Sequence, residues 1–572
     1  MRFLFLSMII AAAAASALSL SNVCTDSNVQ SSLAPITING ITIDSNSVVA
    51  TPVYNYTVSD SDNYPGASGL SFCNVTLSYS HNGISDNVLL WYWLPAQSQF
   101  ENRFLATGGG GYNINSGSSG LAGGIIYGAV TGLTDGGFGG FDVSLEEVIL
   151  KANGTLNYEA LFAFGYKAIH EMTEIGTALT KNYYNTSKTY TYYQGCSEGG
   201  REGWSQVQRH GDQYDGAVIG APAFRQAFQQ VNHLFSGVVE ATLDYAPSPC
   251  ELEKINNDTI AACDSLDGKV DGVVSRTDLC KLHYNVTASV GKNYSCAAST
   301  GFGGSTPAAS GIVTAEAAAV ANAILAGLHD SKGRQVYVSY QSSADFEDAQ
   351  TTYNTTSGQY YATASGLGAA YIQQFLYELN ATTMSIDGIT YDTLRGWMLE
   401  GMQKFADTLQ TVWPDLETFH AHGGKVLHYH GESDPSIPTS SSVIYQDAVR
   451  RTMYPGLGFN ESFAQLDDWY RLFLIPGAAH CAPNAEQPNG PFPQQTLKTV
   501  IDWVEKGVNP KVLNGTVLQG EEYGRHEDIC SFPLRPSWHG ENSTVQCVYD
   551  QVSLDTWFPD LNSIPLPVYA DP

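Results

Sequence analysis

The chain has 572 residues, of which 43% are hydrophobic, and its 56 acidic and 27 basic residues give a formal net charge of −29. This length allows a large buried core and more than one domain, and this composition excludes an intrinsically disordered chain. The strong negative charge argues against nucleic acid or an anionic membrane as a partner.

The first residues have the layout of a secretory signal peptide. One arginine precedes an apolar run, and Ala15-Ser16-Ala17 follows as a small-residue cleavage site. The apolar run is short for a membrane anchor and lacks a basic flank that would stop transfer. We therefore expect residues 1–17 to be removed and the protein to be secreted to the extracellular medium.

Cysteines and glycosylation signals agree with export. The ten cysteines are an even number that can all pair in an oxidising compartment. Twelve Asn-X-Ser/Thr sequons predict a glycosylated surface. Their asparagines are Asn55, Asn74, Asn153, Asn185, Asn257, Asn285, Asn293, Asn354, Asn380, Asn460, Asn514 and Asn542.

The elements begin with strands. Up to about residue 100 the apolar and polar residues alternate as in short strands, and the glycine-rich turn Gly108–Gly111 follows. Strands and helices then alternate, which predicts an α/β fold with a mostly parallel sheet covered on both faces. The segments are 159–184 (helix), 189–195 (strand), 200–211 (helix), 214–224 (strand), 425–434 (strand), 470–480 (strand) and 494–507 (helix).

Between residues 223 and 414 this alternation is interrupted. The segment holds four cysteines, an aspartate-rich loop and a stretch rich in glycine, serine and alanine. An insertion between two core strands is typical of a lid over an active site. We therefore expect a catalytic domain in two parts, 18–222 and 415–572, with a lid domain over 223–414.

The chain's only G-x-S-x-G motif is Gly195-Cys196-Ser197-Glu198-Gly199. It lies between a predicted strand and a predicted helix, which is the context of a nucleophile turn. The two glycines permit a sharp turn that lifts the serine hydroxyl out of the sheet, and the helix N-terminus directs free N–H groups at the site. We therefore interpret Ser197 as a nucleophile.

A serine hydroxyl needs a base and an orienting acid, which follow it in the order acid, then histidine. Asp434 comes just after the strand KVLHYH, and His480 comes just after the strand RLFLI. An aspartate before proline often only forms a turn, and a loop histidine is often only solvated. The position of both residues after consecutive late strands favours the catalytic interpretation.

Cysteines stand beside both catalytic candidates. Cys196 directly precedes Ser197, and Cys481 directly follows His480. A disulfide between them would hold their Cα atoms within about 4.4–6.8 Å and so fix the separation of nucleophile and base. The alternative is two unrelated structural cysteines, which makes their placement a coincidence.

A tetrahedral intermediate needs N–H donors for its oxyanion. The N–H of Glu198, which follows the nucleophile, is one expected donor. The second is expected from the glycine-rich turn, where missing side chains let the backbone approach the substrate. Gly110 is our first candidate, and Gly109 is the next.

The constellation Cys-Ser…Asp…His-Cys resembles the tannase and feruloyl esterase family of secreted serine esterases. The resemblance covers most of the mature chain and is densest in YYQGCSEGGREGWSQVQRHGDQYDGAVIGAPAF, HYHGESDPSIPTSS and LIPGAAHCAPN. It implies an α/β-hydrolase fold with Ser197 as nucleophile, His480 as base and later acid, and Asp434 as orienting acid. It also implies that Cys196 and Cys481 form the linking disulfide and that no organic cofactor is needed.

The sequence around these motifs, with GREGWSQVQR, GAPAF and DPSIP, is closer to the tannase branch of this family. The resemblance therefore implies hydrolysis of galloyl esters in tannins, through an acyl-enzyme. Feruloyl or other hydroxycinnamoyl esters of plant cell-wall polysaccharides are the alternative. The expected partner is a small or polymer-linked phenolic ester, and the sequence sets no expectation for the oligomeric state.

An aspartate-rich loop, CDSLDGKVDGVVSRTDLC, suits calcium. Carboxylates at Asp264, Asp267 and Asp271 alternate with glycine turns, although the spacing is not that of an EF-hand. An acidic solvated turn is the alternative. The family resemblance implies a structural Ca²⁺ in the lid, with Lys269 and Val273 contributing carbonyl oxygens.

The remaining cysteines are paired with less support. Cys263 and Cys280 bracket the aspartate-rich loop and are expected to close it. Cys24–Cys73 and Cys530–Cys547 are neighbours along the chain, which leaves Cys250–Cys296, so these three pairs follow by elimination.

Four histidines and one isoleucine are ambiguous. His420, His422, His428 and His430 form two H-x-H motifs that suggest zinc, but no companion cysteine or carboxylate spacing supports a metal. We expect core histidines or histidines that support the catalytic residues. Ile437, three residues past Asp434, could line an acyl pocket or simply pack in its loop.

Two functions of other classes compete with the esterase. A serine peptidase on the same sheet predicts amide cleavage and a subsite for a charged terminus, and the sequence has no signature of one. A binding protein that keeps the fold without catalysis would ordinarily lack a member of the triad, and none is missing.

Overall fold

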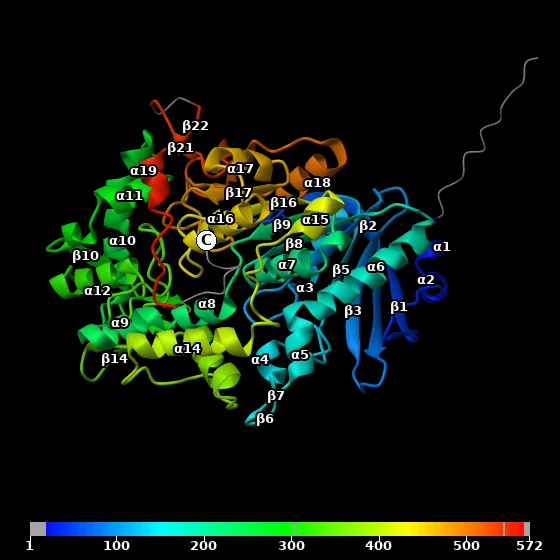
Figure 1. Ribbon diagram of the computed structural model, residues 1–572, viewed down its shortest axis with the longest axis horizontal. Helices are drawn as coiled ribbons and strands as arrows, with labels where there is room; N and C mark the ends of the chain where they lie inside the picture. Colours follow the sequence, from blue (N-terminus) through cyan, green and yellow to red (C-terminus); the bar gives the residue numbers. More distant parts are fainter. Residues whose placement is uncertain (1–18, 302–303, 541–543, 565–572) are drawn as a thin grey trace, which may run out of the picture.

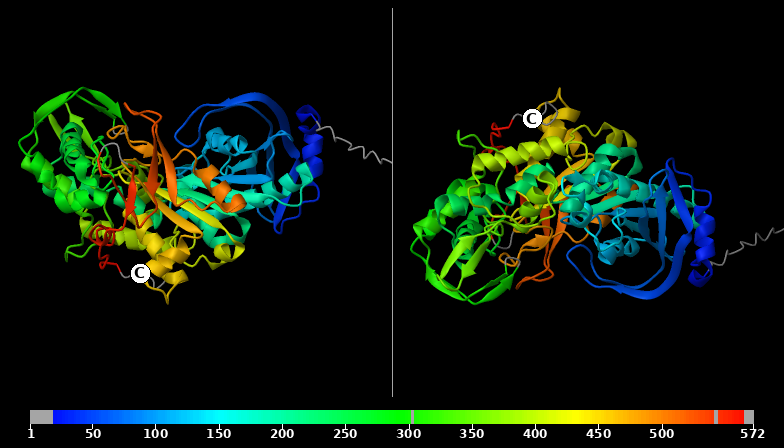
Figure 2. Two further views of the ribbon diagram at one scale, coloured as in Figure 1. Left: turned by 90° about the horizontal axis from the view of Figure 1, so that it is seen from above. Right: turned by 90° about the horizontal axis from the view of Figure 1, so that it is seen from below.

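The computed structural model describes residues 19–301, 304–540 and 544–564. The predicted signal peptide, residues 1–17, and the sequon at Asn542 lie outside these ranges. A nine-stranded sheet runs through the molecule, with the long N-terminal strands at one end and the inserted segment at the other (Figures 1 and 2).

The strands of this sheet lie in the order β1-β2-β3-β5-β4-β8-β9-β16-β17. Pairs from β1 to β5 are antiparallel, and all pairs from β5 to β17 are parallel. The strands are β1 (Ile41–Val58), β2 (Ala67–His81), β3 (Val88–Pro95), β4 (Arg103–Thr107), β5 (Ala129–Thr134), β8 (Tyr190–Cys196), β9 (Gly216–Gly220), β16 (Lys425–Gly431) and β17 (Tyr470–Ile475). Without β1, this is the strand order of the α/β-hydrolase fold, as expected.

Helices cover both faces of the sheet because successive strand residues point to opposite sides. On one face, Tyr193 and Ile219 pack in the main core with residues of α6 (Ala168–Tyr184) and α7 (Glu198–Arg209). On the other face, Tyr192 and Val218 pack against α18 (Thr496–Lys506). The central strands are therefore buried on both sides, as in β5, where every residue is buried.

The expected helix over 159–184 is interrupted. It forms α5 (Tyr158–Phe162), a π-helical turn (Ala163–Lys167) and then α6. The guanidinium of Arg201 donates to the carbonyl oxygens of Phe164 and Gly165 at 3.0 Å each. The buried arginine therefore bonds to the backbone at the point where the helix widens into its π turn.

The expected short N-terminal strands are long. β1 has 18 residues and β2 has 15, and their pairing shifts register at three places. The remaining elements before β9 are α1 (Leu20–Val23), α2 (Asp26–Leu33), α3 (Gly117–Ile126), α4 (Leu145–Val148), β6 (Leu150–Ala152) and β7 (Thr155–Leu156).

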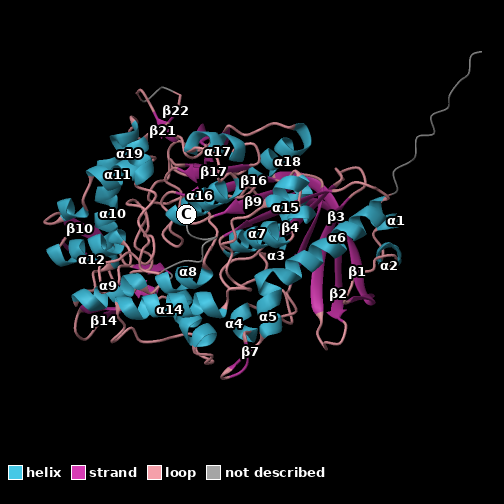
Figure 3. Ribbon diagram, in the orientation of Figure 1, coloured by secondary structure: helices cyan, strands magenta, loops and turns pink. Residues whose placement is uncertain are grey.

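A helical insertion separates β9 from β16, which agrees with the expected position of the lid, and helices dominate it (Figure 3). Its helices are α8 (Gln226–Asn232), α9 (Phe235–Leu243), α10 (Pro249–Cys263), α11 (Thr277–His283), α12 (Ala315–Ala326), α13 (Gly366–Ala370), α14 (Tyr391–Lys404) and α15 (Glu417–His422). Its strands are β10 (Asn293–Cys296), β11 (Ser299–Gly301), β12 (Gly304–Thr306), β13 (Ala309–Ile312), β14 (Thr351–Asn354) and β15 (Gln359–Ala362). The boundaries 223 and 414 stay predictions.

The C-terminal part completes the core and flanks the insertion (Figure 1). Its further elements are α16 (Ser440–Met453), α17 (Phe459–Leu466), β18 (Pro491–Phe492), β19 (Val512–Val517), β20 (His526–Cys530), β21 (Arg535–Ser537), β22 (Gln546–Val548) and α19 (Gln551–Asp555). Across the described ranges, no helix has the length and apolar character needed to cross a membrane.

All five expected disulfides are present. They are Cys24–Cys73, Cys196–Cys481, Cys250–Cys296, Cys263–Cys280 and Cys530–Cys547, and they use every cysteine of the chain. The three pairs that followed only by elimination are therefore confirmed as well.

Candidate active site

Ser197 occupies a sharp turn between β8 and α7. Its backbone has φ +65° and ψ −123°, a strained conformation for a residue with a side chain. The flanking glycines are required, because a Cβ on Gly195 would lie 2.6 Å from the carbonyl oxygen of Gly199. The turn therefore presents the hydroxyl above the end of the sheet, as the motif predicts.

Ser197, His480 and Asp434 form a continuous hydrogen-bonded chain. Nε2 of His480 lies 2.8 Å from Oγ of Ser197, and Nδ1 lies 2.8 Å from Oδ2 of Asp434. Asp434 follows β16 and His480 follows β17, so three strands end at one edge of the sheet and bring the three side chains together. This geometry allows the imidazole to take the hydroxyl proton while the carboxylate holds the ring.

The Cys196–Cys481 disulfide joins the nucleophile turn to the histidine loop. Its Cα atoms are 6.1 Å apart, and the bridge spans 285 residues of sequence. Cys481 has φ +58°, a left-handed conformation that few residues other than glycine adopt. The covalent link therefore holds a strained loop against a strained turn, with the reacting pair between them.

The carboxylate of Asp434 is fully buried, and both of its oxygens accept hydrogen bonds from the protein. Oδ1 accepts from the N–H groups of Ser436 and Ile437 at 2.8 Å each, and Oδ2 accepts from His480 and His430. Burial alone favours the protonated acid, but the two histidines hold the pKa of Asp434 well below its usual range. Asp434 is therefore an anion.

A relay of buried side chains supports this anion. Tyr470 donates its O–H to Nδ1 of His428 (2.9 Å), and Nε2–H of His428 donates to the Ser442 oxygen (2.9 Å). The Ser442 hydroxyl in turn donates to Nδ1 of His430 (2.7 Å). Nε2–H of His430 then donates to Asp434 at 3.1 Å. Every ring nitrogen is used, so these histidines support the triad and leave no lone pair for zinc.

The other H-x-H motif lies in a helix, and the expectation of a core or supporting histidine is wrong for His422, which is exposed. His420 and His422 lie in α15, and His422 contacts Asp215 at 3.9 Å on the surface. Ile437 is buried, with its backbone carbonyl accepting from His430 and its N–H bonded to Asp434. These contacts explain Ile437 as a part of the loop that holds Asp434.

The predicted oxyanion donors have different surroundings. Glu198 is the first residue of α7, where a helix has no internal acceptor for the N–H. The N–H of Gly110 donates to the carbonyl oxygen of Asn113 at 3.1 Å, and that of Gly109 donates to the Glu202 carboxylate at 2.8 Å. Gly110 must share its N–H to serve an oxyanion, and its role stays a prediction.

Sequence reasoning missed the buried charges beneath this turn. Glu198, Arg201 and Glu202 are at most 2% exposed, and Nε of Arg201 donates to Glu198 at 2.6 Å. Burial raises the pKa of Glu198 to about 7 against the pull of Arg201 and, with the charge of Glu198 adding to burial, raises that of Glu202 well above its ordinary value. Glu198, Arg201 and Glu202 are spaced as neighbours along a helix, and this spacing does not indicate that all three side chains are buried.

Side chains of the insertion also lie near the triad. His233, which directly follows α8, lies 2.8 Å from Asp348, and the hydroxyl of Tyr340 donates to the same carboxylate at 2.6 Å. Glu347 acts electrostatically on both His233 and His480. These residues belong to no motif, so only the folded lid reveals them.

The aspartate-rich loop is compact and largely buried. The Oδ1 atoms of Asp264, Asp267 and Asp271 accept backbone N–H groups of the loop, while Lys269 pairs with Asp271 at 2.6 Å. Oδ2 of Asp267 is buried without a hydrogen-bond partner. Within the described ranges, no group of three or more His, Cys, Asp or Glu side chains is placed to hold a metal ion.

Val273 is buried at the end of this loop, and its N–H reaches Asp271 at 3.1 Å. Burial raises the pKa of Asp267 to about 7, with the charges of Asp271 and Asp264 adding to the effect.

Comparison with known proteins supports one family. The family model described as tannase and feruloyl esterase matches residues 73–554. A tannase of Aspergillus oryzae is 48% identical over 585 aligned residues, which cover 98% of this chain and 98% of the relative. A probable feruloyl esterase of Arthroderma benhamiae is 31% identical, with coverage of 84% and 86%.

Solved structures give the same order of similarity. The tannin acyl hydrolase from Aspergillus niger matches with a TM-score of 0.93 and 55% identity, over 96% of this chain and 99% of that chain. The feruloyl esterase B from Aspergillus oryzae matches with a TM-score of 0.68 and 26% identity, over 91% and 100%.

Proposed function

The chain belongs to the tannase and feruloyl esterase family, and we propose that it is a secreted serine esterase that hydrolyses galloyl esters and depsides of tannins and releases gallic acid. The observation that carries this proposal is the hydrogen-bonded chain Ser197–His480–Asp434, held by the Cys196–Cys481 disulfide. Identity to a tannase, 48% over nearly the whole chain, supports the galloyl substrate.

Each residue of the chain has a defined task in this mechanism. His480 takes the proton of Ser197 as its oxygen attacks the ester carbonyl, and Asp434 stabilises the imidazolium that forms. The N–H of Glu198 donates to the oxyanion, with Gly110 as second donor. His480 then protonates the leaving alcohol and activates the water that releases the acid.

Feruloyl esters are the alternative substrates. The feruloyl esterase relatives are 26% and 31% identical, well below the tannases. A galloyl ring carries three hydroxyls, and polar lid groups such as His233 and Glu347 near the imidazole suit such a ring.

Three substrates measured side by side test the proposal. We expect hydrolysis of methyl gallate, a kcat/KM for methyl ferulate lower by about tenfold or more, and no cleavage of a peptide amide. A preference for ferulate moves the chain to the alternative. Failure on both esters rejects the esterase, and amide cleavage shows a peptidase.

The pH dependence of methyl gallate hydrolysis follows from His480. Burial disfavours the imidazolium, but Asp434 overrides it, so the pKa of His480 is raised above its ordinary 6.5. Only the neutral ring acts as a base, so kcat/KM should be full at high pH and fall as the pH drops through a midpoint above 6.5. Glu347→Gln removes a carboxylate that also raises this pKa, so its midpoint should lie lower; an unchanged or higher midpoint contradicts the assignment.

We also propose that the loop of residues 263–280 binds a structural Ca²⁺. The carboxylates of Asp264, Asp267 and Asp271 and the carbonyl oxygens of Lys269 and Val273 would hold it, and because the three carboxylates are not gathered around one point in the described structure, binding would draw them together. The buried Asp267 oxygen without a hydrogen-bond partner and the raised pKa of this carboxyl suit a position that a cation would neutralise.

Chelation should therefore lower the Tm, and adding Ca²⁺ should restore it. Asp267→Asn should abolish the response, while Asp528→Asn, an exposed acidic residue on β20, should keep it. A Tm that EGTA does not change rejects the calcium site.

Secretion and glycosylation complete the proposal. Five disulfides support folding in an oxidising compartment. Of the eleven sequon asparagines in the described ranges, ten are exposed and Asn74 is half-buried with its side-chain oxygen bonded to Trp91. Intact-mass measurement before and after glycosidase treatment tests both features.

A further inference from the structure

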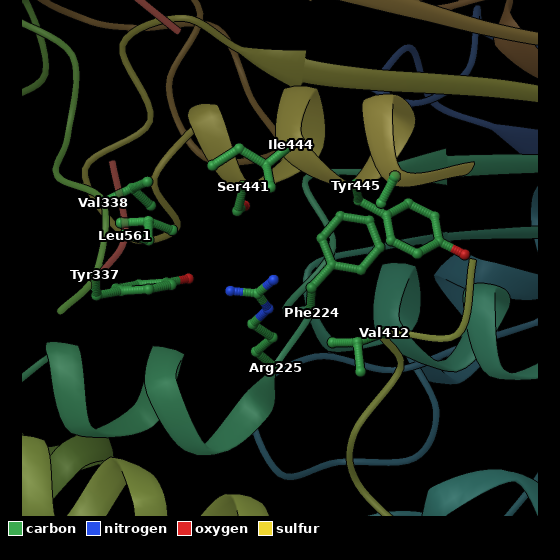
Figure 4. A pocket seen from close by; sticks show the side chains of 10 residues that line it. Phe224, Arg225, Tyr337, Val338, Val412, Ser441, Ile444, Tyr445 and Leu561 are labelled. Atoms are coloured by element: carbon green, nitrogen blue, oxygen red, sulfur yellow. The ribbon is translucent and has the colours of Figure 1, made fainter. Parts of the chain in front are cut away.

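A small cavity lies between the start of the insertion and helix α16 (Figure 4). Its volume is about 30 Å³, and its lining includes Phe224, Arg225, Tyr337, Ser441, Tyr445 and Leu561. None of the triad residues lines it. Its walls are mainly apolar, so the polar groups that face it determine what it can hold.

Arg225 brings a positive charge into this cavity. It is half-buried, directly precedes α8 and has φ +37°. Among the described residues, no carboxylate pairs with its guanidinium and no acceptor bonds to it. Burial lowers the pKa of Arg225, and the phenol of Tyr337 is the only group that acts against this.

Other interior arginines are paired. Arg201 contacts Glu198, Arg535 contacts Glu432, and Arg450 contacts Asp447. The chain has twice as many acidic as basic residues, so acidic partners are plentiful. A half-buried guanidinium without a counter-ion is partly removed from water, which is unfavourable, so an anion in the cavity would stabilise it.

Two hydroxyls face the same space. Oγ of Ser441 is buried and has no hydrogen-bond partner, and the hydroxyl of Tyr337 has only a 3.5 Å contact with Gln229. Figure 4 shows the guanidinium next to both hydroxyls, beside that of Tyr337 and below that of Ser441. Arginine and hydroxyl donors together bind anions, because both offer N–H or O–H groups to one acceptor.

The size of the cavity decides the class of anion. A single water needs about 10–15 Å³ on this measure, so the cavity admits two or three particles of that size. A galloyl group does not fit. We propose that Arg225, Ser441 and Tyr337 bind a small monovalent anion, a halide or a formate-sized carboxylate, as a buried counter-ion.

The anion would stabilise the junction between sheet and insertion. The N–H of Ala223 donates to the carbonyl oxygen of Ser197 at 3.3 Å, and Phe224 stacks on Tyr445 with ring centroids 4.4 Å apart. Arg225 follows directly and leads into α8, the helix that His233 caps at its C-terminal end. Neutralising its charge therefore stabilises the segment that connects the nucleophile turn to the lid.

Bromide provides a direct test, because its anomalous scattering identifies it in a crystal. Crystals of the full chain soaked in sodium bromide should show an anomalous peak beside the Arg225 guanidinium. Arg225→Met crystals should lack the peak, and Ser441→Ala crystals should show it weakened. A wild-type map without this peak overturns the proposal.

Thermal unfolding gives a second readout that does not depend on esterase activity. At constant ionic strength, replacing sodium gluconate, whose anion is too large, by sodium bromide, chloride or formate should raise the Tm by about 2 °C and saturate. The small anion that raises the Tm most is the one that the cavity binds best.

Arg225→Met should remove the response, whereas Arg209→Met, which removes one charge from the surface, should keep it. If Arg225→Met does not fold, Ser441→Ala and the wild-type titration decide. Equal Tm values in gluconate and in all three small anions contradict the site.

Discussion

Replacing Ser197 by alanine should lower kcat for methyl gallate by about 10⁴–10⁶-fold, a barrier increase of about 5–8 kcal/mol. Oγ of Ser197 is the only atom of the triad that forms a covalent bond to the substrate, and it lies 2.8 Å from Nε2 of His480. The fold should be unaffected, because the backbone strain of this turn is held by the glycines and the disulfide. Single-turnover and steady-state kinetics on methyl gallate measure the loss.

Ser205→Ala is a matched control. Ser205 lies on the same helix, is fully buried, and its hydroxyl only bonds to the carbonyl oxygen of Glu202 at 2.8 Å. Its activity should stay within about threefold of the wild type. Activity in the Ser197 variant close to that of the control would show that a different nucleophile is used.

The double variant Cys196→Ala/Cys481→Ala should lose both stability and activity. The bridge closes a loop of 285 residues, so its removal should lower the free energy of unfolding by about 2–5 kcal/mol. It also fixes the distance between Ser197 and His480, and an error of about 1 Å in such a pair costs about 10²-fold in rate. Denaturant unfolding and kcat/KM measure the two effects.

Removing the Cys250–Cys296 bridge separates these two effects. That bond lies in the insertion and joins residues 46 apart. The variant Cys250→Ala/Cys296→Ala should be destabilised similarly while kcat/KM changes by less than about threefold. If both double variants lose activity equally, the link beside the triad has no special role in positioning.

The triad could be predicted because its signals are local. Ser197 is marked by glycines that a sharp turn requires, and Asp434 and His480 each follow an apolar strand directly. Parallel strands end at one edge of a sheet, so three such signals converge without knowledge of the loops. The disulfide between neighbouring cysteines then follows from the same convergence.

Other parts of the site depend on contacts that no local pattern records. The π turn near Phe164 bonds to Arg201, which reaches it from another helix. His233 and Asp348 meet only through the folded insertion, across 115 residues of sequence. The bond from Gly110 to Asn113, which limits its role as an oxyanion donor, also needs the folded turn to be seen.

The order of the catalytic residues along the chain has a consequence for biosynthesis. Ser197 is synthesised 283 residues before His480, and the whole insertion lies between them. At 5–20 residues per second, the ribosome needs roughly 15 to 60 s to cover this distance. A nascent chain is therefore incapable of ester cleavage until residue 480 of its 572 has been made. Oxidation of Cys196 and Cys481 comes later still, so with the proposed secretion full activity should arise only in an oxidising compartment.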